Sequence, residues 1–198
     1  PFNICRLMYL YDYKIAEVGD FEWYQNVYKE IWFDHEYSRY GVEVEKNDIV
    51  VDCGANVGFF TLYALDKGAK HVYSIECDDK NMGSLHYNLE NTNSTIIKEY
   101  VGFGDGNFNI ENILERINKP FIDIIKIDIE WAEYDLLLNT PDSIMKRVNK
   151  WVIEVHDIYT HHELIFQIIE KFSKNGFDIN FEHIHKETNL ALLYIKKR

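Results

Sequence analysis

Residues 48–60 read DIVVDCGANVGFF, and this stretch decides the fold. It begins with a short β-branched run, which is typical of a buried strand. Gly54 and Gly58 then permit a tight turn, and a helical pattern follows from about Val57 to Lys67. A strand, a glycine turn and a helix in this order are typical of a parallel sheet whose strands are linked by helices.

The same alternation continues on the C-terminal side of this stretch. We predict strands at residues 48–53, 71–76, 94–101, 121–129 and 150–156, and helices at 57–67, 80–91, 110–118, 132–148 with a break at Pro141, and 160–173. Two further strands, 177–185 and 190–198, flank a short polar turn and form an antiparallel hairpin. The pattern predicts a three-layer, Rossmann-like α/β fold with a seven-stranded, mostly parallel sheet and a C-terminal antiparallel hairpin.

The chain of 198 residues suits one main domain, which we assign to residues 41–198. Residues 1–40 form an aromatic-rich N-terminal segment, with a helical stripe over residues 20–33, that we expect to cover the sheet or the site as a lid. Its aromatic side chains could stack on a sugar ring, although core packing is their commoner use. They include Trp23, Tyr24, Trp32, Tyr37 and Tyr40.

Composition excludes several classes of protein. The 46% apolar content argues against a disordered chain, and no apolar run approaches a membrane span. The net charge of −12 makes a nucleic-acid partner unlikely on electrostatic grounds.

Cys5, Cys53 and Cys77 form no CxxC pair, which favours a reduced, cytoplasmic location. The first residues lack a secretory signal pattern, and a start at Pro1 is typical of a fragment or a processed product.

A glycine turn followed by an acid at the next strand end favours a nucleoside ligand. Glu76 ends the second predicted strand, where a carboxylate can accept hydrogen bonds from both ribose hydroxyls. The turn does not match GxGxxG, and no GK[ST] follows it, so neither a dinucleotide site nor a P-loop is well matched. A nucleoside cofactor without phosphate, in a fold with a terminal hairpin, points to S-adenosylmethionine.

Four blocks of the sequence resemble the FkbM-type methyltransferases. They read GVEVEKNDIVVDCGANVGFFTLYALDKGAKHVYSIE, FNIENIL, IDIIKIDIEWAEYDLL and VIEVH, and the resemblance runs from about Glu36 to His156. It implies a class I methyltransferase fold and methyl transfer from S-adenosylmethionine, in most cases to a hydroxyl of a sugar or polyketide. The acceptor expected here is a carbohydrate or another hydroxylated small molecule.

The resemblance also implies a cofactor pocket. Its methionine end is shaped by the glycine turn, Glu76 holds the ribose, and Gly102 contacts adenine through its backbone, with Asp105 as a weaker candidate. The full set of cofactor-binding residues that we predict is Asp52, Cys53, Gly54, Ala55, Asn56, Gly58, Glu76, Gly102 and Asp128.

Charged residues alternate along the fourth and fifth predicted strands, whose carboxyl ends should meet beside the cofactor. Lys126 is best explained by a structural ion pair with Asp52 or Asp128. The predicted catalytic residues are His156, as general base, with Asp128, Glu130 and Glu154.

A divalent cation on Asp128, Glu154 and His156 is the less favoured alternative, because no short ligand spacing demands it. We therefore predict no metal. Four other histidines, His161, His162, His183 and His185, are expected at the surface or in the hairpin.

Trp131 departs from the family pattern, which has glycine there, as in EGAE. If the family has glycine there because the backbone needs a positive φ, tryptophan in the same conformation is strained by about 1–3 kcal/mol. If the family has glycine because another group must come close to the backbone, the indole forms a wall of the acceptor pocket or partly blocks it.

Two other functions stay open. One is a non-catalytic cofactor-binding or interaction module of the same fold. The other, less favoured, is a nicotinamide-dependent oxidoreductase, which lacks its expected GxGxxG. The absence of NPPY or DPPY after the fourth strand argues against transfer to a base amino group.

Overall fold

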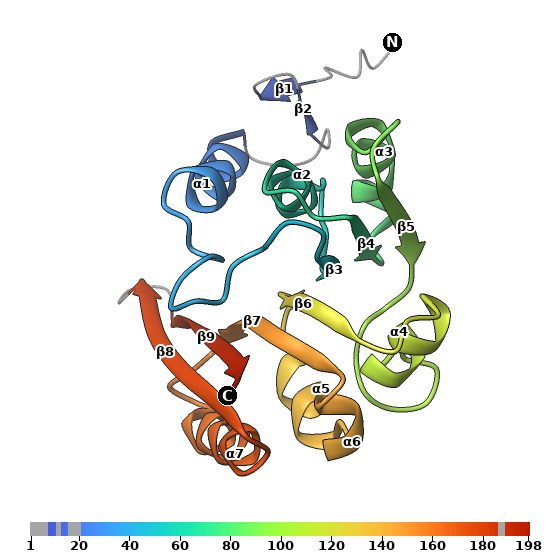
Figure 1. Cartoon of the computed structure of the whole chain (residues 1–198). Helices are drawn as coiled ribbons and strands as arrows, with labels where there is room; N and C mark the ends of the chain where they lie inside the picture. Colours follow the sequence, from blue (N-terminus) through green and yellow to red (C-terminus); the bar gives the residue numbers. More distant parts are fainter. Residues whose placement is uncertain (1–7, 11–12, 16–20, 186–188) are drawn as a thin grey trace.

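The computed structural model describes residues 8–10, 13–15, 21–185 and 189–198, and a seven-stranded sheet lies at its centre (Figure 1). The strand order is β5-β4-β3-β6-β7-β9-β8. The strands are β3 (Ile49–Cys53), β4 (His71–Glu76), β5 (Ser94–Lys98), β6 (Ile122–Ile127), β7 (Val148–His156), β8 (Phe177–His185) and β9 (Leu190–Lys197). The first five run parallel, and β9 lies antiparallel between β7 and β8. This arrangement confirms the predicted sheet and its terminal hairpin.

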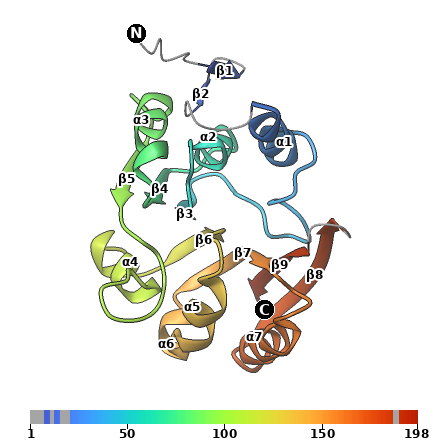
Figure 2. The same ribbon diagram turned by 180° about the vertical axis from the view of Figure 1, so that it is seen from behind.

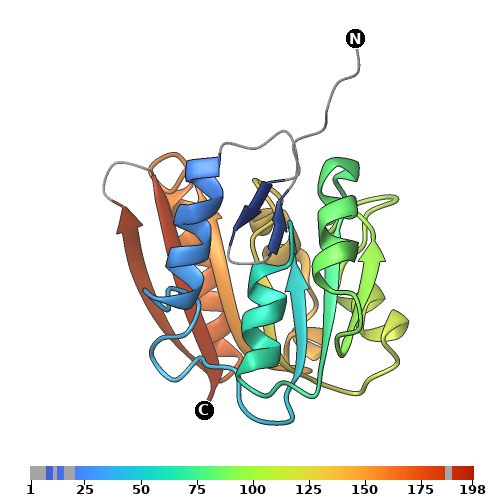
Figure 3. The same ribbon diagram turned by 90° about the horizontal axis from the view of Figure 1, so that it is seen from above.

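Helices cover both faces of the sheet and complete the three predicted layers (Figures 1 and 2). One face carries α1 (Phe21–Trp32), α2 (Phe59–Asp66) and α3 (Asp79–Asn88), which lie in a row in Figure 3. The other face carries α4 (Ile110–Arg116), α5 (Glu133–Asn139), α6 (Asp142–Met145) and α7 (His162–Lys174). The longest of these helices, α7, has 13 residues, and no helix among the described residues is long and apolar enough to cross a membrane.

Alternate residues of each central strand enter different cores. Ile125 and Ile127 of β6 pack with α4 to α7, whereas Ile124, just before them, packs with α1 and α2. This division follows from the two-residue period of a strand. A strand that is buried on both faces has a nearly continuous apolar sequence, as β3 and β6 have.

The polar exceptions to that apolar pattern lie at the point where the strand order reverses. From β3 the chain moves outward to β4 and β5, and then returns to β6 and β7 on the other side of β3. Asp52 of β3 stands directly beside Lys126 of β6. In parallel sheets, ligands bind beyond the carboxyl ends of the strands at such a reversal.

The predicted break at Pro141 is confirmed: α5 and α6 are separate helices, because the residue before Pro141, Thr140, adopts extended backbone (ψ 123°). Two other details differ from the sequence prediction. The fourth strand ends at Ile127, so Asp128 and Glu130 lie in the following loop rather than on the strand. A small antiparallel hairpin, β1 (Met8–Leu10) with β2 (Tyr13–Ile15), lies in the N-terminal segment and was not predicted.

The described part of the N-terminal segment shares a core with the sheet. Tyr24 and Ile31 of α1, and Tyr37 after it, are buried in one cluster with Phe59 and Phe60 of α2. The rings of Tyr24 and Tyr37 therefore pack in the core. Two of the other predicted cover residues, Trp23 and Tyr40, are about half exposed.

Candidate active site

The glycine turn after β3 brings three strand ends together. The backbone N–H groups of Gly54 and Ala55 both donate to the carbonyl of Ile75 in β4. Gly54 has a φ of 76°, and a Cβ there would lie 1.7 Å from the carbonyl oxygen of Asp128. Only glycine fits this position, so the turn depends on a close backbone contact with the end of β6.

Glu76 is held at the end of β4 by backbone donors. Its Oε2 accepts from the N–H of Asn56 at 2.7 Å, and its Oε1 accepts from the N–H groups of Cys77 and Asp78 at 2.8 and 2.7 Å. A carboxylate oxygen has two lone pairs, so Oε2, with one donor, can accept from one more group, whereas both lone pairs of Oε1 are already used. The carboxylate is thus fixed where the sequence predicts a ribose-binding acid.

Two cavities meet at the carboxyl ends of the strands. The smaller, about 290 Å³, is lined by Glu76, Asp78, Asn81, Tyr100 and Val101, among others. The larger, about 720 Å³, lies toward α1 and β7. Both are lined by Trp23, Gly54, Asn56, Asp128 and Glu130, which form a common wall. A ligand that crosses this wall could fill one cavity and react in the other.

The larger cavity is strongly acidic. Six carboxylates line it and only two ammonium groups do. The carboxylates are those of Glu30, Asp34, Glu36, Asp128, Glu130 and Glu154, and the ammonium groups are those of Lys29 and Lys126. Such a cavity favours a ligand that carries positive charge.

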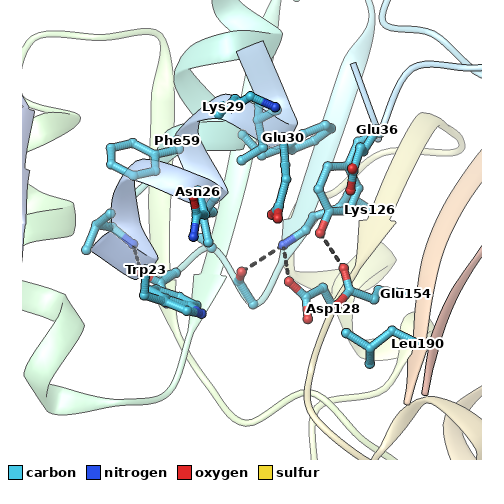
Figure 4. Close-up of a pocket in the computed structure, with 18 of the residues that line it drawn as sticks. Trp23, Asn26, Lys29, Glu30, Glu36, Phe59, Lys126, Asp128, Glu154 and Leu190 are labelled. Atoms are coloured by element: carbon cyan, nitrogen blue, oxygen red, sulfur yellow. Dashed lines mark hydrogen bonds and ion pairs between the residues drawn. The ribbon is translucent and has the colours of Figure 1, made fainter. Parts of the chain in front are cut away.

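Lys126 lies at the centre of a buried ion network (Figure 4). Its Nζ is 3.4 Å from Oδ1 of Asp52 and 3.2 Å from Oδ2 of Asp128, and it donates to the carbonyl of Gly54 at 2.9 Å. Burial lowers the pKa of Lys126, but the charges of Asp128 and Asp52 outweigh that effect and raise it. The predicted structural ion pair is confirmed, with both carboxylates as partners.

His156 is held by a residue that the sequence interpretation missed. Its Nδ1 donates to Oε1 of Glu133 at 2.7 Å, and the side chain of Glu133 is fully buried. Its Nε2 lies 3.5 Å from Oε2 of Glu130 and 3.6 Å from Oε1 of Glu154. Burial lowers the pKa of His156, but the hydrogen bond and charge of Glu133, with the charges of Glu154 and Glu130, raise it to about 9.

Glu154 points into the same cavity from β7, next to Asp128 (Figure 4). Burial and the charge of Asp128 raise its pKa to about 7, against the opposing effects of Tyr37, His156 and Lys126. All three predicted catalytic carboxylates, those of Asp128, Glu130 and Glu154, lie near His156.

Trp131 and Glu130 both have positive φ, 74° and 50°. Of the two explanations for the family glycine, the structure supports the strained backbone. The indole is 62% exposed and lies 5.9 Å from the His156 ring, between ring centroids. Trp131 lines neither of the two cavities, so its indole lies beside His156 on the outer side of the site.

The remaining predicted cofactor residues support the site less directly. Asp52 and Cys53 are fully buried beneath the turn, and Gly58 begins α2 with a φ of 95°. Ala55 lines the larger cavity. Gly102 and Asp105 are not among the lining residues of either cavity, whereas Tyr100 and Val101 line the smaller one.

Of the histidines outside the site, His161 packs on Tyr134 and His183 on Tyr159. His162 lies 3.1 Å, by its Nδ1, from the carbonyl of Tyr159, and His185 ends β8. His161, His162 and His183 do not line either cavity.

Asp128, Glu130 and His156 could also hold a divalent cation, because one ligand atom from each lies within 4.8 Å of the others. Oxygen and imidazole ligands suit such ions. These three ligands differ in one residue from the cation site considered in the sequence analysis, which had Glu154 where the structure has Glu130.

Comparisons with known proteins agree with this architecture. The fold is that of the class I S-adenosylmethionine-dependent methyltransferases. It is similar to that of Aeropyrum pernix fibrillarin, solved with natively bound S-adenosyl-L-methionine, with a TM-score of 0.62 and 14% identity. The match covers 86% of this chain and 76% of that one. Residues 106–179 match the family described as methyltransferase FkbM domain, which confirms the resemblance to the FkbM-type methyltransferases.

Two relatives differ in what they methylate. The 31-O-demethyl-FK506 methyltransferase FkbM of Streptomyces tacrolimicus is 50% identical over 40 residues, 20% of this chain and 15% of that protein. Protein arginine N-methyltransferase 1.1 of Arabidopsis thaliana is 32% identical over 110 residues, 55% of this chain and 26% of that protein. The chain spans only about a quarter of the length of the arginine methyltransferases it matches.

Proposed function

We propose that this protein transfers a methyl group from S-adenosylmethionine to a hydroxyl group of a sugar, glycan or other hydroxylated small molecule. The observation that carries the proposal is His156, which lines the large cavity: its Nδ1 is anchored on Glu133, and its Nε2 lies 3.5 and 3.6 Å from Glu130 and Glu154, two other lining residues. An alcohol needs a proton acceptor of this kind as it attacks the methyl carbon.

The two cavities suit the two substrates. The ribose hydroxyls of the cofactor would bind Glu76 in the smaller cavity, with adenine toward Tyr100. The positive sulfonium would lie at the common wall near Asp128, where carboxylates favour it. The acceptor would enter the larger cavity on the side of His156 and Glu154. Holding both reactants in line can supply about 7–11 kcal/mol of the barrier reduction.

A second acceptor class has its own support. The acidic cavity would also accommodate a cationic nitrogen, and one group of relatives is named as arginine N-methyltransferases. A guanidinium would pair with Glu130 and Glu154 rather than require an imidazole base.

Calorimetry and a turnover panel test these alternatives. We expect S-adenosylmethionine and S-adenosylhomocysteine to bind and NAD not to bind. The panel contains methyl glycosides and an arginine-containing peptide, with release of S-adenosylhomocysteine as the readout. Methylation of the peptide alone would replace the hydroxyl proposal by the nitrogen one. Cofactor binding with no turnover would favour a non-catalytic module, and NAD binding alone would reject the methyltransferase.

The dependence of kcat/KM on pH tests the base. Because the pKa of His156 is raised to about 9, only about one molecule in a hundred carries neutral imidazole at pH 7. We expect kcat/KM for the methyl glycoside to rise about tenfold per pH unit and to level near pH 9. Glu133→Gln removes a hydrogen-bonded charge from Nδ1, so its profile should level at lower pH. A profile that is flat from pH 7 to 9 in the parent protein would reject His156 as the base.

A further inference from the structure

Tyr37 reaches the site from the N-terminal segment, outside the sheet. Its hydroxyl donates to Oε2 of Glu154 at 2.5 Å, across 117 positions of sequence. The side chain is 7% exposed and lines the large cavity. The sequence interpretation treated Tyr37 only as an aromatic cover residue.

Packing fixes the ring of Tyr37 from several sides. It contacts the ring of Phe60 edge-on, with 5.8 Å between centroids, and Lys126 Nζ lies 5.6 Å from its centroid. The carbonyl of the preceding residue, Glu36, accepts from the hydroxyl of Tyr194 in β9 at 2.5 Å. The phenol hydroxyl is therefore placed before any ligand arrives, and little side-chain entropy is lost when it acts.

The hydrogen bond from Tyr37 determines which oxygen of Glu154 is available. With Oε2 occupied, Oε1 lies toward Nε2 of His156 at 3.6 Å. His156 is fixed on its other side by Glu133. Tyr37, Glu154, His156 and Glu133 thus form one continuous polar chain along the wall of the cavity.

We propose that Tyr37 is a positioning residue for methyl transfer, which fixes the Glu154 carboxylate so that Oε1 stabilises the positive charge that His156 gains when its Nε2 takes the acceptor's proton. This proposal rests on the proposed function. It gives the N-terminal segment a part in the chemistry beyond covering the sheet. Loss of one hydrogen bond to a charged group should slow the chemical step by about tenfold to a hundredfold.

Tyr37→Phe tests the proposal, because it keeps the ring packing and removes only the hydroxyl. Tyr63→Phe is the matched control, since Tyr63 lies in the same buried cluster but donates its hydroxyl to Ser38 at 3.1 Å. With the methyl glycoside that the parent turns over fastest, we expect Tyr37→Phe to lower kcat by about tenfold to a hundredfold. KM for S-adenosylmethionine should stay unchanged, and Tyr63→Phe should retain the parent kcat.

A second readout needs no acceptor. In protein labelled with ¹⁵N-histidine, the Nε2 resonance of His156, assigned with His156→Gln, should move in Tyr37→Phe and stay in place in Tyr63→Phe. An unmoved resonance, or an unchanged kcat in Tyr37→Phe, overturns the proposal. A parent that methylates none of the panel counts against the proposed function, and the resonance then decides the role of Tyr37 alone.

Discussion

Glu130 and Trp131 adopt a left-handed backbone one after the other, which is unusual for large L side chains. Both residues lie next to His156, so the conformation of this turn determines where the Glu130 carboxylate and the Trp131 indole lie relative to the His156 ring. Strain of this kind persists where the surrounding structure determines it, and it is concentrated at functional sites. The sequence alone identifies the position, because the family pattern has glycine there, but only the φ value selects between strain and close approach.

Trp131→Gly should relieve that strain. We expect the free energy of unfolding to rise by about 1 kcal/mol, measured by urea denaturation. Asn91→Gly is the matched control: Asn91 has a φ of 60°, which asparagine tolerates, so little gain is expected there. A clear loss of stability in Trp131→Gly would mean that the contact between the indole and His156 outweighs the strain.

At the scale of elements, the site depends on the spacing between β3 and β6. The Gly54 turn touches the carbonyl of Asp128, and Lys126 then joins both strand ends through Asp52 and Asp128. The sequence predicts these strands well because β-branched runs and glycine turns are local signals. It fails to predict Glu133 and Tyr37, because their contacts join residues 23 and 117 positions apart and leave no local pattern.

Gly54→Ala should disrupt this junction. A Cβ at 1.7 Å from the Asp128 carbonyl forces the strand ends apart, so we expect a loss of about 3 kcal/mol or more in the free energy of unfolding. Gly106→Ala separates the steric effect from the conformational one. Gly106 also has a positive φ, 83°, but a Cβ there meets nothing within 4 Å, so about 1 kcal/mol is expected. Equal losses in the two variants would contradict a steric role for Gly54.

For the whole molecule, the acidic site links stability to pH. The pKa of Glu154 rises from an ordinary 4.5 to about 7 on folding, and that of His156 from 6.5 to about 9. In each case the folded state binds more protons than the unfolded chain between the two values. Stability is therefore lost as pH rises, from Glu154 between about pH 4.5 and 7 and from His156 between about pH 6.5 and 9.

We expect the free energy of unfolding, from urea denaturation at several pH values, to fall between pH 5.5 and 9. Glu154→Gln should flatten the lower part of this dependence, and His156→Gln the upper part. A stability that increases with pH across this range would show that the two groups do not carry these shifts.

The contact between Tyr194 and Glu36 joins β9 to the segment that carries Tyr37, across 158 positions. During synthesis the N-terminal partner leaves the ribosome long before the other exists, and contacts of such long range form late in folding. Tyr37 thus gains its full support only after β9 has docked. A growing or truncated chain can bury much of its sheet before Tyr37 is held beside Glu154. We therefore expect the chain to become compact first and to gain the proposed methyl-transfer activity only when it is complete through β9.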